Sequence, residues 1–184
     1  MAHQFDALND TLTHFIQAQH IFFCGTAGAT GRVNLSPKGM DSLHVMGPNR
    51  IVWRNLTGSG NETAGHLAQI NRMTLMWCSF GPKPMIMRCF GTARTLHTRD
   101  ADFANLNALF PPSEGARQIY DMHVEMAQTS CGYAVPKMTY AGERDVLETW
   151  TSNKGPEGIA DYWAKSNQTT IDGDPTYIIA PPAK

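Results

Sequence analysis

Three short segments of the chain carry cationic and polar side chains at spacings that could bind an anion. The first is GRVNLSPKG, which has at alternate positions Arg32, Asn34, Ser36 and Lys38. Alternate residues of a β-strand point to the same face, so a strand here would present two cations, an amide and a hydroxyl together. Such a face can receive a polar, anionic ligand. It is equally typical of the exposed face of an antiparallel strand, and the segment alone leaves both interpretations open.

The second segment, WRNLTGSGNET, leads from a strand-like run into a predicted helix. It supplies Arg54, followed by hydroxyl groups and by the backbone N–H groups of a helix start, which favour anions. Its glycines match neither the dinucleotide-binding G-x-G-x-x-G pattern nor a Walker loop. A plain helix cap by Ser59 or Asn61 would explain the same residues. Glu62 argues against a nearby phosphate unless it pairs with a cation, for which Arg32 or Arg54 is the candidate.

The third segment, MRCFGTAR, places Arg88 in an otherwise apolar strand. A buried guanidinium is costly unless it is paired. The sequence therefore predicts that Arg88 meets either a carboxylate or a ligand.

Other kinds of site lack their usual patterns. No H-E-x-x-H or C-x-x-C-H occurs, and the HVE at 123–125 is followed by no P-C-x-x-C, so no metal site and no covalent haem site are predicted. The G-x-S-x-G turn of the α/β-hydrolases is also missing.

Composition points to an ordinary globular chain. Of its 184 residues 42% are hydrophobic and 17% charged, and the net charge is −1, which suggests neither nucleic acid nor a membrane surface as a partner. The first ten residues have no basic start or apolar run, so we expect no secretory signal. Four cysteines are far apart and form no C-x-x-C pair, which favours a reducing cytoplasm: Cys24, Cys78, Cys89 and Cys131.

Periodicity and turn residues predict one domain, residues 1–184, of α+β class with a central β-barrel and helices around it. The expected strands are 20–27, 32–38, 42–46, 50–56, 72–80 and 84–97. The expected helices are 4–18, 62–70, 100–110, 113–128 and 143–167. Between the last two helices we expect a loop with room for one more strand, and residues 171–184 read as a surface tail.

Taken together and in order, these segments resemble one branch of the pyridoxamine 5′-phosphate oxidase-like, FMN-binding split-barrel family. The blocks that carry the resemblance run from about His20 to about Pro175. They are GRVNLSPKG, NLTGSGNETAGHL, RMTLMWCSFGPKPMIMRCFGTART, CGYAVPKMTYAGERDVLETW and IDGDP.

The resemblance implies a mainly β core, a six-stranded split β-barrel with surrounding helices and a helical C-terminal third. It also implies a homodimer with two FMN sites at the interface. The implied FMN contacts are Arg32, Asn34, Ser36, Lys38, Trp53, Arg54, Ser59, Gly60, Asn61 and Thr63. The strand with Arg88 and Cys89 matches the one that reaches the polar edge of the flavin ring in the oxidases.

The sequence departs from the true pyridoxamine 5′-phosphate oxidases at two places. Where they carry a Ser-Arg-Lys cluster, this chain has Ser59, Gly60 and Asn61, which lack both cations. Their terminal Arg-x-His element is also missing, because no Arg or His follows Asp172. We therefore expect FMN binding without oxidation of pyridoxamine phosphate.

Two hypotheses about function follow from the resemblance. The first is an FMN-dependent oxidoreductase that is reduced by NAD(P)H or by a small-molecule substrate, with the flavin supplying the chemistry. The second is a carrier or sensor with little turnover that binds flavin, deazaflavin or haem, with His66 or His123 as the haem ligand. A weaker third hypothesis is a dimeric scaffold that has lost its cofactor.

Overall fold

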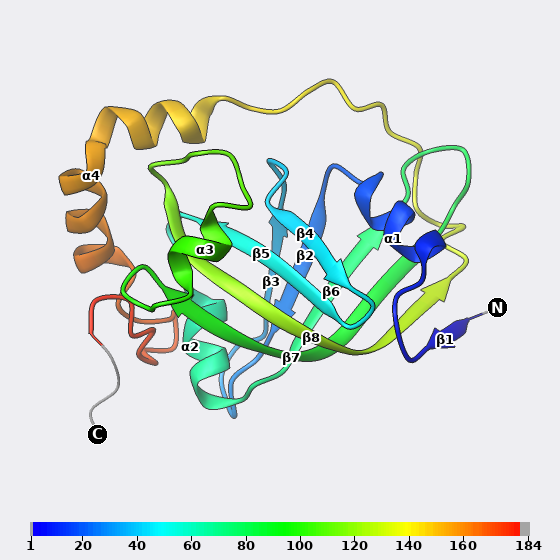
Figure 1. Ribbon diagram of the computed structural model, residues 1–184, viewed down its shortest axis with the longest axis horizontal. Coiled ribbons are helices and arrows are strands. Elements are labelled where there is room, and N and C mark those ends of the chain that lie inside the picture. The colour runs from blue at the N-terminus through cyan, green and yellow to red at the C-terminus, as the bar shows by residue number, and fades with distance from the viewer. Residues whose placement is uncertain (1, 181–184) are drawn as a thin grey trace.

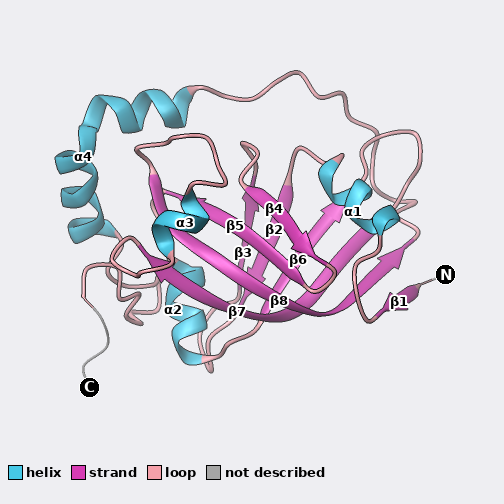
Figure 2. Ribbon diagram, in the orientation of Figure 1, coloured by secondary structure: helices cyan, strands magenta, loops and turns pink. Residues whose placement is uncertain are grey.

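Twelve elements follow one another along residues 2–180, which are the residues that the computed structural model describes (Figures 1 and 2). The strands are β1 (His3–Phe5), β2 (Phe22–Thr26), β3 (Asn34–Lys38), β4 (Leu43–Gly47), β5 (Arg50–Leu56), β6 (Met73–Cys78), β7 (Ile86–His97) and β8 (Ala116–Ser130). The helices are α1 (Asp10–Gln17), α2 (Glu62–Gln69), α3 (Phe103–Asn107) and α4 (Val146–Ser166). In this part of the chain, no helix is both long and apolar enough to cross a membrane.

The strands form one antiparallel sheet in the order β3-β2-β6-β7-β8-β5-β4, and β1 pairs with β8 beside this path. The predicted α+β class with a mainly β core is therefore confirmed. The predicted count of six strands is not, because the described sheet has eight. The short β1 was not foreseen: residues 4–18 were expected to be one helix, and α1 covers only the second part of that range.

The sheet curls strongly around its main core. In strand order, three strands separate β2 from β5, which would place them about 19 Å apart in a flat sheet. Yet Phe22 of β2 and Trp53 of β5 meet edge to face, with ring centroids 5.7 Å apart. The core between them includes Leu75, Trp77 and Tyr120. On the other face of the sheet a smaller apolar cluster packs under α3.

The largest difference between the sequence-based prediction and the structure is at β8. Residues 113–128 were predicted to be a helix, but Ala116–Ser130 is the longest strand and pairs with both β7 and β5. Its run YDMHVEM alternates apolar and polar residues, and from Tyr120 to Val124 the apolar ones are buried while His123 is exposed. That alternation is the period of a half-buried strand. Because β8 occupies the start of the last third of the chain, that third is only partly helical and not helical throughout as was expected.

The segment after β8 runs along the open side of the sheet to α4, as the top of Figure 1 shows. α4 is bent at Gly155, where φ is +62°, and Pro156 follows directly. Residues 171–180, predicted to be a surface tail, pack against the domain through Thr176 and Ile178, which are both buried. The remainder of that predicted tail, 181–184, lies outside the described residues.

Candidate functional site

A cavity of about 220 Å³ lies where β3, the end of β5 and the start of α2 come together. We call it the cation cleft, because two of its lining residues are Lys38 and Arg117. Its full lining is Asn34, Ser36, Lys38, Asn55, Leu56, Gly58, Ser59, Gly60, Asn61, Glu62, Thr63 and Arg117. Seven of the predicted site residues are therefore gathered here: Asn34, Ser36, Lys38, Ser59, Gly60, Asn61 and Thr63.

β3 supplies one wall of the cleft. Asn34, Ser36 and Lys38 alternate along the strand and face inward, as the spacing predicted. The Asn34 amide donates to the hydroxyl of Thr63 at 3.4 Å. The outward positions are apolar, and Val33 and Leu35 are 76% and 65% exposed. This strand thus reverses the usual pattern, with polar groups toward the molecule and apolar ones toward solvent.

Lys38 lies at the inner end of this wall. Its Nζ donates to the Asn55 Oδ1 at 3.1 Å and stands 5.6 Å from the centroid of the Trp53 ring. Burial lowers the pKa of Lys38 below its ordinary value. The neighbouring Cys24 opposes this effect, and the charge of Arg117 adds a smaller lowering. No carboxylate within residues 2–180 forms an ion pair with this ammonium group.

Arg117 of β8 supplies the second cation. It is 2% exposed, and its guanidinium donates to the carbonyl of Gly58 at 3.2 Å and to the Asn167 Oδ1 at 2.8 Å. Its Nε has no partner in the described part of the chain. Burial lowers the pKa of Arg117, although a guanidinium still remains charged at neutral pH. The cleft therefore holds one buried cation, Arg117, and one partly buried cation, Lys38, and neither forms an ion pair with an anion of residues 2–180.

The N-terminus of α2 opens onto the same cleft. Asn61 is the N-cap residue, but its side chain does not cap the helix, which corrects the expectation that Ser59 or Asn61 would do so. Instead the Asn61 amide donates to the carbonyl of Asn167 at 3.1 Å, and its Oδ1 is buried without a partner among the described residues. The first backbone N–H groups of α2 thus keep their attraction for an anion.

Glu62 is held by the C-terminal segment, and not by a cation. Its carboxylate accepts the backbone N–H of Ile171 at 3.0 and 3.2 Å. The proposed partner Arg32 pairs with Asp172 instead, and this contact lowers the pKa of the Asp172 carboxyl. The expected Glu62 ion pair with Arg32 or Arg54 was wrong, because a backbone donor from a distant segment meets the carboxylate.

Asn167, the C-cap residue of α4, links several parts of the cleft by hydrogen bonds. Its amide donates to the carbonyls of Gly58 and Ser59 at 3.0 and 3.2 Å, while its Oδ1 accepts from Arg117. The side chain is fully buried. One residue therefore fixes both the turn before α2 and the second cation. The C-terminal segment also crosses α2 at Gly65, where a Cβ would lie 2.3 Å from the Cγ2 of Thr170.

Two predicted contacts belong to the main core. Trp53 is fully buried, its indole N–H points to the Met73 Sδ at 3.5 Å, and its ring stacks on Tyr120 at 4.4 Å. Cys89 is also fully buried, and burial raises the pKa of its thiol to about 12. Neither residue lines the cation cleft.

Three predicted cations also lie away from the cleft. Arg54 is buried on the other face of the sheet, donates to the carbonyl of Pro111 at 2.6 Å and covers the Phe110 ring. Arg88 is half-buried on β7 and takes part in none of the ion pairs within residues 2–180. Arg32 is 71% exposed and pairs with Asp172.

Sequence reasoning missed Arg117 and Asn55. Asn55 is buried between Lys38 and Gln118, with its amide donating to the Gln118 Oε1 at 3.0 Å. Arg117 and Gln118 lie in the strand that was predicted to be a helix. The alternation that follows them, starting at Tyr120, was the signal that could have placed them on a buried strand.

The two histidines considered as haem ligands lie elsewhere. His66 is 1% exposed inside the fold, with Nδ1 3.1 Å from the hydroxyl of Thr26. His123 is exposed on β8. Neither lines the cation cleft.

Comparison with known proteins places the chain in a family. Residues 8–131 match the sequence pattern of the pyridoxamine 5′-phosphate oxidase family. The pyridoxamine 5′-phosphate oxidase family protein UstO of Aspergillus flavus is 30% identical over 191 residues, which cover 93% of this chain and 76% of that protein. The chain therefore belongs to the pyridoxamine 5′-phosphate oxidase family, as the ordered sequence blocks predicted.

Solved structures agree at the level of the fold. A candidate pyridoxamine 5′-phosphate oxidase from Lactobacillus delbrueckii matches with a TM-score of 0.54 at 16% identity, covering 67% of this chain and 94% of that one. HupZ of Group A Streptococcus matches with a TM-score of 0.53 at 16% identity, covering 65% and 91%. The family match ends at residue 131, directly after β8, so α4 and Asn167 lie beyond it.

Proposed function

We propose that this protein is an FMN-binding oxidoreductase and that the cation cleft holds the phosphate end of FMN. The observation that carries the proposal is the pair of cations in the cleft, the buried Arg117 and the partly buried Lys38, which lack a carboxylate partner within residues 2–180. Buried charges are costly unless they are paired, so an anionic ligand is the natural complement. The open N-terminus of α2 favours the same kind of ligand.

The unpartnered polar atoms fit a ligand with both phosphate and hydroxyl groups. The Arg117 Nε is a donor and suits a phosphate oxygen. The Asn61 Oδ1 is an acceptor, because the amide of the same side chain already donates to Asn167, and it suits a hydroxyl. The ribityl-phosphate chain of FMN offers both kinds of group.

The size of the cleft supports a site shared between two subunits. Its volume of about 220 Å³ is below the roughly 300–1,000 Å³ that small-molecule sites usually have, so FMN would extend beyond it. β3 ends the sheet on this side and exposes Val33 and Leu35. We therefore propose a homodimer in which the partner subunit completes the FMN site.

When bound, FMN supplies hydride and electron transfer. The residues of this chain bind and orient it: Lys38 and Arg117 hold negative charge, and Asn167 fixes the turn over Gly58 and Ser59. A small-molecule substrate or NAD(P)H would provide the electrons. We do not expect pyridoxamine phosphate to be oxidised, because Gly60 and Asn61 replace the cations of the true oxidases.

The decisive experiment is the absorbance spectrum of the purified protein, with the released cofactor identified by mass. We expect a flavin spectrum and the mass of FMN, and FMN should restore both after removal. A colourless protein that FMN cannot reconstitute would contradict the proposal. A Soret band would favour haem, and the mass of a deazaflavin would favour the carrier or sensor alternative.

A further inference from the structure

A second and larger cavity lies beside the cation cleft. Its volume is about 890 Å³. One wall is the sheet, at the start of β2, the end of β3 and the turn after β6. The other wall is formed by residues 138–150, which lie beyond the stretch that matches the sequence pattern of the family. We call this cavity the strap groove and residues 131–145 the strap.

The strap is attached to the sheet at two points. The backbone N–H of Met138 donates to the carbonyl of Phe80 at 3.1 Å. The ring of Tyr140 stacks on His20, with centroids 3.6 Å apart and planes 7° apart, and the Tyr140 hydroxyl donates to Glu143 at 2.9 Å. These contacts hold the strap above the sheet with a space beneath it.

The groove is lined mainly by apolar and aromatic side chains. Its large apolar lining residues are Ile21, Pro37, Met40, Phe80, Met138, Tyr140, Val146, Leu147 and Trp150. Met138 and Val146 are 60% and 67% exposed, although water is an unfavourable neighbour for them. Gathered apolar surface of this kind marks a binding site.

Size and charge favour a small organic molecule as the occupant. The volume lies within the range of small-molecule sites, and flat rings can stack on aromatic walls. The charged lining residues carry both signs, namely Lys38, Arg144 and Glu143, so they do not form a dedicated phosphate site. Lys38 also lines the cation cleft, and the two cavities are therefore neighbours.

We propose that the strap groove binds an aromatic, largely apolar small molecule next to the cation cleft. This site requires no bound flavin, because all of its walls belong to this chain. If the proposed function also holds, the groove delivers an aromatic substrate to the edge of the flavin site, and its substrates differ in class from phosphorylated pyridoxamine.

Binding can be measured directly by titrating the flavin-free protein with the fluorescent dye anilinonaphthalene sulfonate. In the double variant Met138→Ser and Val146→Ser we expect roughly tenfold weaker binding, because two apolar contacts are lost. The matched control is Ile171→Ser with Ile179→Ser, two residues of similar exposure, 72% and 50%, outside the groove. The control should bind the dye as the wild type does. Naphthol should displace the dye, whereas pyridoxamine 5′-phosphate should not.

Equal dye affinity in the two double variants would overturn the proposal. So would displacement by pyridoxamine phosphate as readily as by naphthol. A dimer that weakens in the groove variant while dye binding stays unchanged would show that a second copy of the chain fills the groove. Thermal unfolding checks that each variant folds, and none of these outcomes depends on FMN, so the proposed function is tested separately.

Discussion

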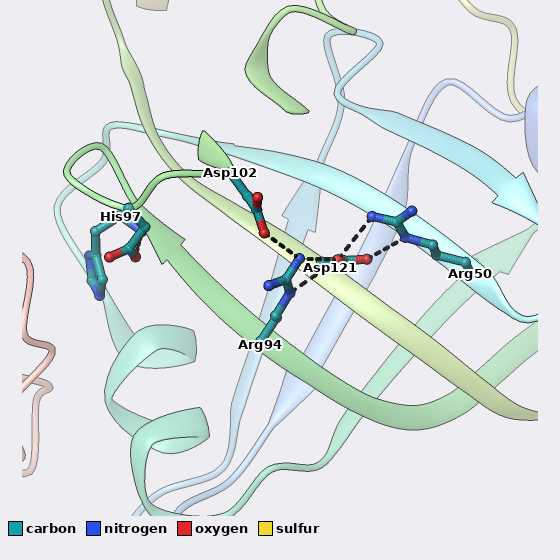
Figure 3. A network of polar contacts seen from close by, with 6 residues as sticks. Arg50, Arg94, His97, Asp102 and Asp121 are labelled. Atoms are coloured by element: carbon teal, nitrogen blue, oxygen red, sulfur yellow. Dashed lines mark hydrogen bonds and ion pairs between the residues drawn. The ribbon is translucent and has the colours of Figure 1, made fainter. Parts of the chain in front are cut away.

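Two polar clusters on the same sheet differ in whether their cations are paired with carboxylates. On the outer face, Arg50 and Arg94 both bind Asp121, with nitrogen–oxygen distances between 2.8 and 3.1 Å, and Arg94 also reaches Asp102 at 3.1 Å (Figure 3). We call these four residues the outer network. It contains two cations and two anions, and its arginine side chains are about half exposed. The cation cleft contains two cations without an anionic partner among residues 2–180, and Arg117 is almost fully buried.

The outer network neutralises its own charges, whereas the cations of the cleft have no carboxylate partner among residues 2–180 and suit the anionic ligand proposed above. Hydrogen bonds from Arg50 and Arg94 outweigh the effect of partial burial and lower the pKa of Asp121, so the network is satisfied as it stands. In the cleft, burial lowers the pKa values of Lys38 and Arg117, which means that the fold disfavours their charged forms. Four substitutions can break or sharpen this contrast.

The largest effect is expected for Arg117→Met, which keeps an unbranched apolar side chain and removes the guanidinium charge. We expect FMN affinity to fall by about two orders of magnitude, because a charge-assisted hydrogen bond contributes about 1.5–3 kcal/mol. Titration of flavin fluorescence measures the loss. Arg54→Met is the matched control, since Arg54 is also buried but lies on the other face of the sheet. Equal losses in both variants would show that the effect comes from the fold.

Lys38→Met should weaken FMN binding by about 30-fold, again through one lost charged contact. The flavin-free protein should be as stable as the wild type or more stable, because a partly buried ammonium without a carboxylate partner disappears. In the wild type, FMN affinity should fall as the pH rises through the lowered pKa of Lys38, below its ordinary value of about 10.5. Chemical denaturation and a pH series of titrations test these points. A pH dependence that survives in Lys38→Met would assign it to another group.

Asn55→Asp places a carboxylate directly beside Lys38. The new carboxylate would face Lys38. The amide of Gln118, whose Nε2 is buried without a partner within residues 2–180, would turn to donate to it. We expect the pKa of Lys38 to rise and FMN affinity to fall by about tenfold, because the carboxylate competes with the phosphate. The same titration measures the affinity. Unchanged or tighter binding would mean that Lys38 does not meet the phosphate.

Asp121→Asn removes an anion from the outer network and should have the smallest effect. FMN affinity should remain within about twofold, and the free energy of unfolding should fall by about 1 kcal/mol or less, since ion pairs with half-exposed arginines are screened by solvent and contribute little. Because the folded-state pKa of Asp121 is lowered, its stabilisation is present above the unfolded pKa of about 3.9 and is lost as the pH falls through the folded pKa. The stability difference between variant and wild type should therefore vanish in acid. Denaturation curves at neutral and acidic pH test this.

The sequence predicted those parts of the cleft that depend on local pattern. The alternation of Asn34, Ser36 and Lys38 predicted that their side chains share one face of a strand. The turn after β5 was predicted to lead into a helix, and α2 begins there. The family resemblance supplied the order of the segments. Arg117 was missed because the period of two in β8 was interpreted as helical.

The contacts that complete the cleft could not be predicted in this way, because they join residues far apart in the chain. Glu62 and Ile171 are separated by 109 positions, as are Gly58 and Asn167. No periodicity links such pairs, since their meeting depends on how α4 and the C-terminal segment pack. Arg54 was predicted to contact the ligand because it lies near the turn after β5. Neighbouring residues of a strand point to opposite faces, however, and Arg54 lies on the face of the sheet away from the cleft.

The long separation between Gly58 and Asn167 has a consequence for how the protein is made. During synthesis the β-sheet can begin to form once β8 has left the ribosome, but the turn over the cleft still lacks its anchor. Asn167 emerges later, and the Ile171 N–H that holds Glu62 later still. A nascent chain therefore passes through a stage with a folded sheet and an unfinished cleft. The FMN binding proposed above should therefore require that the C-terminal segment has been translated.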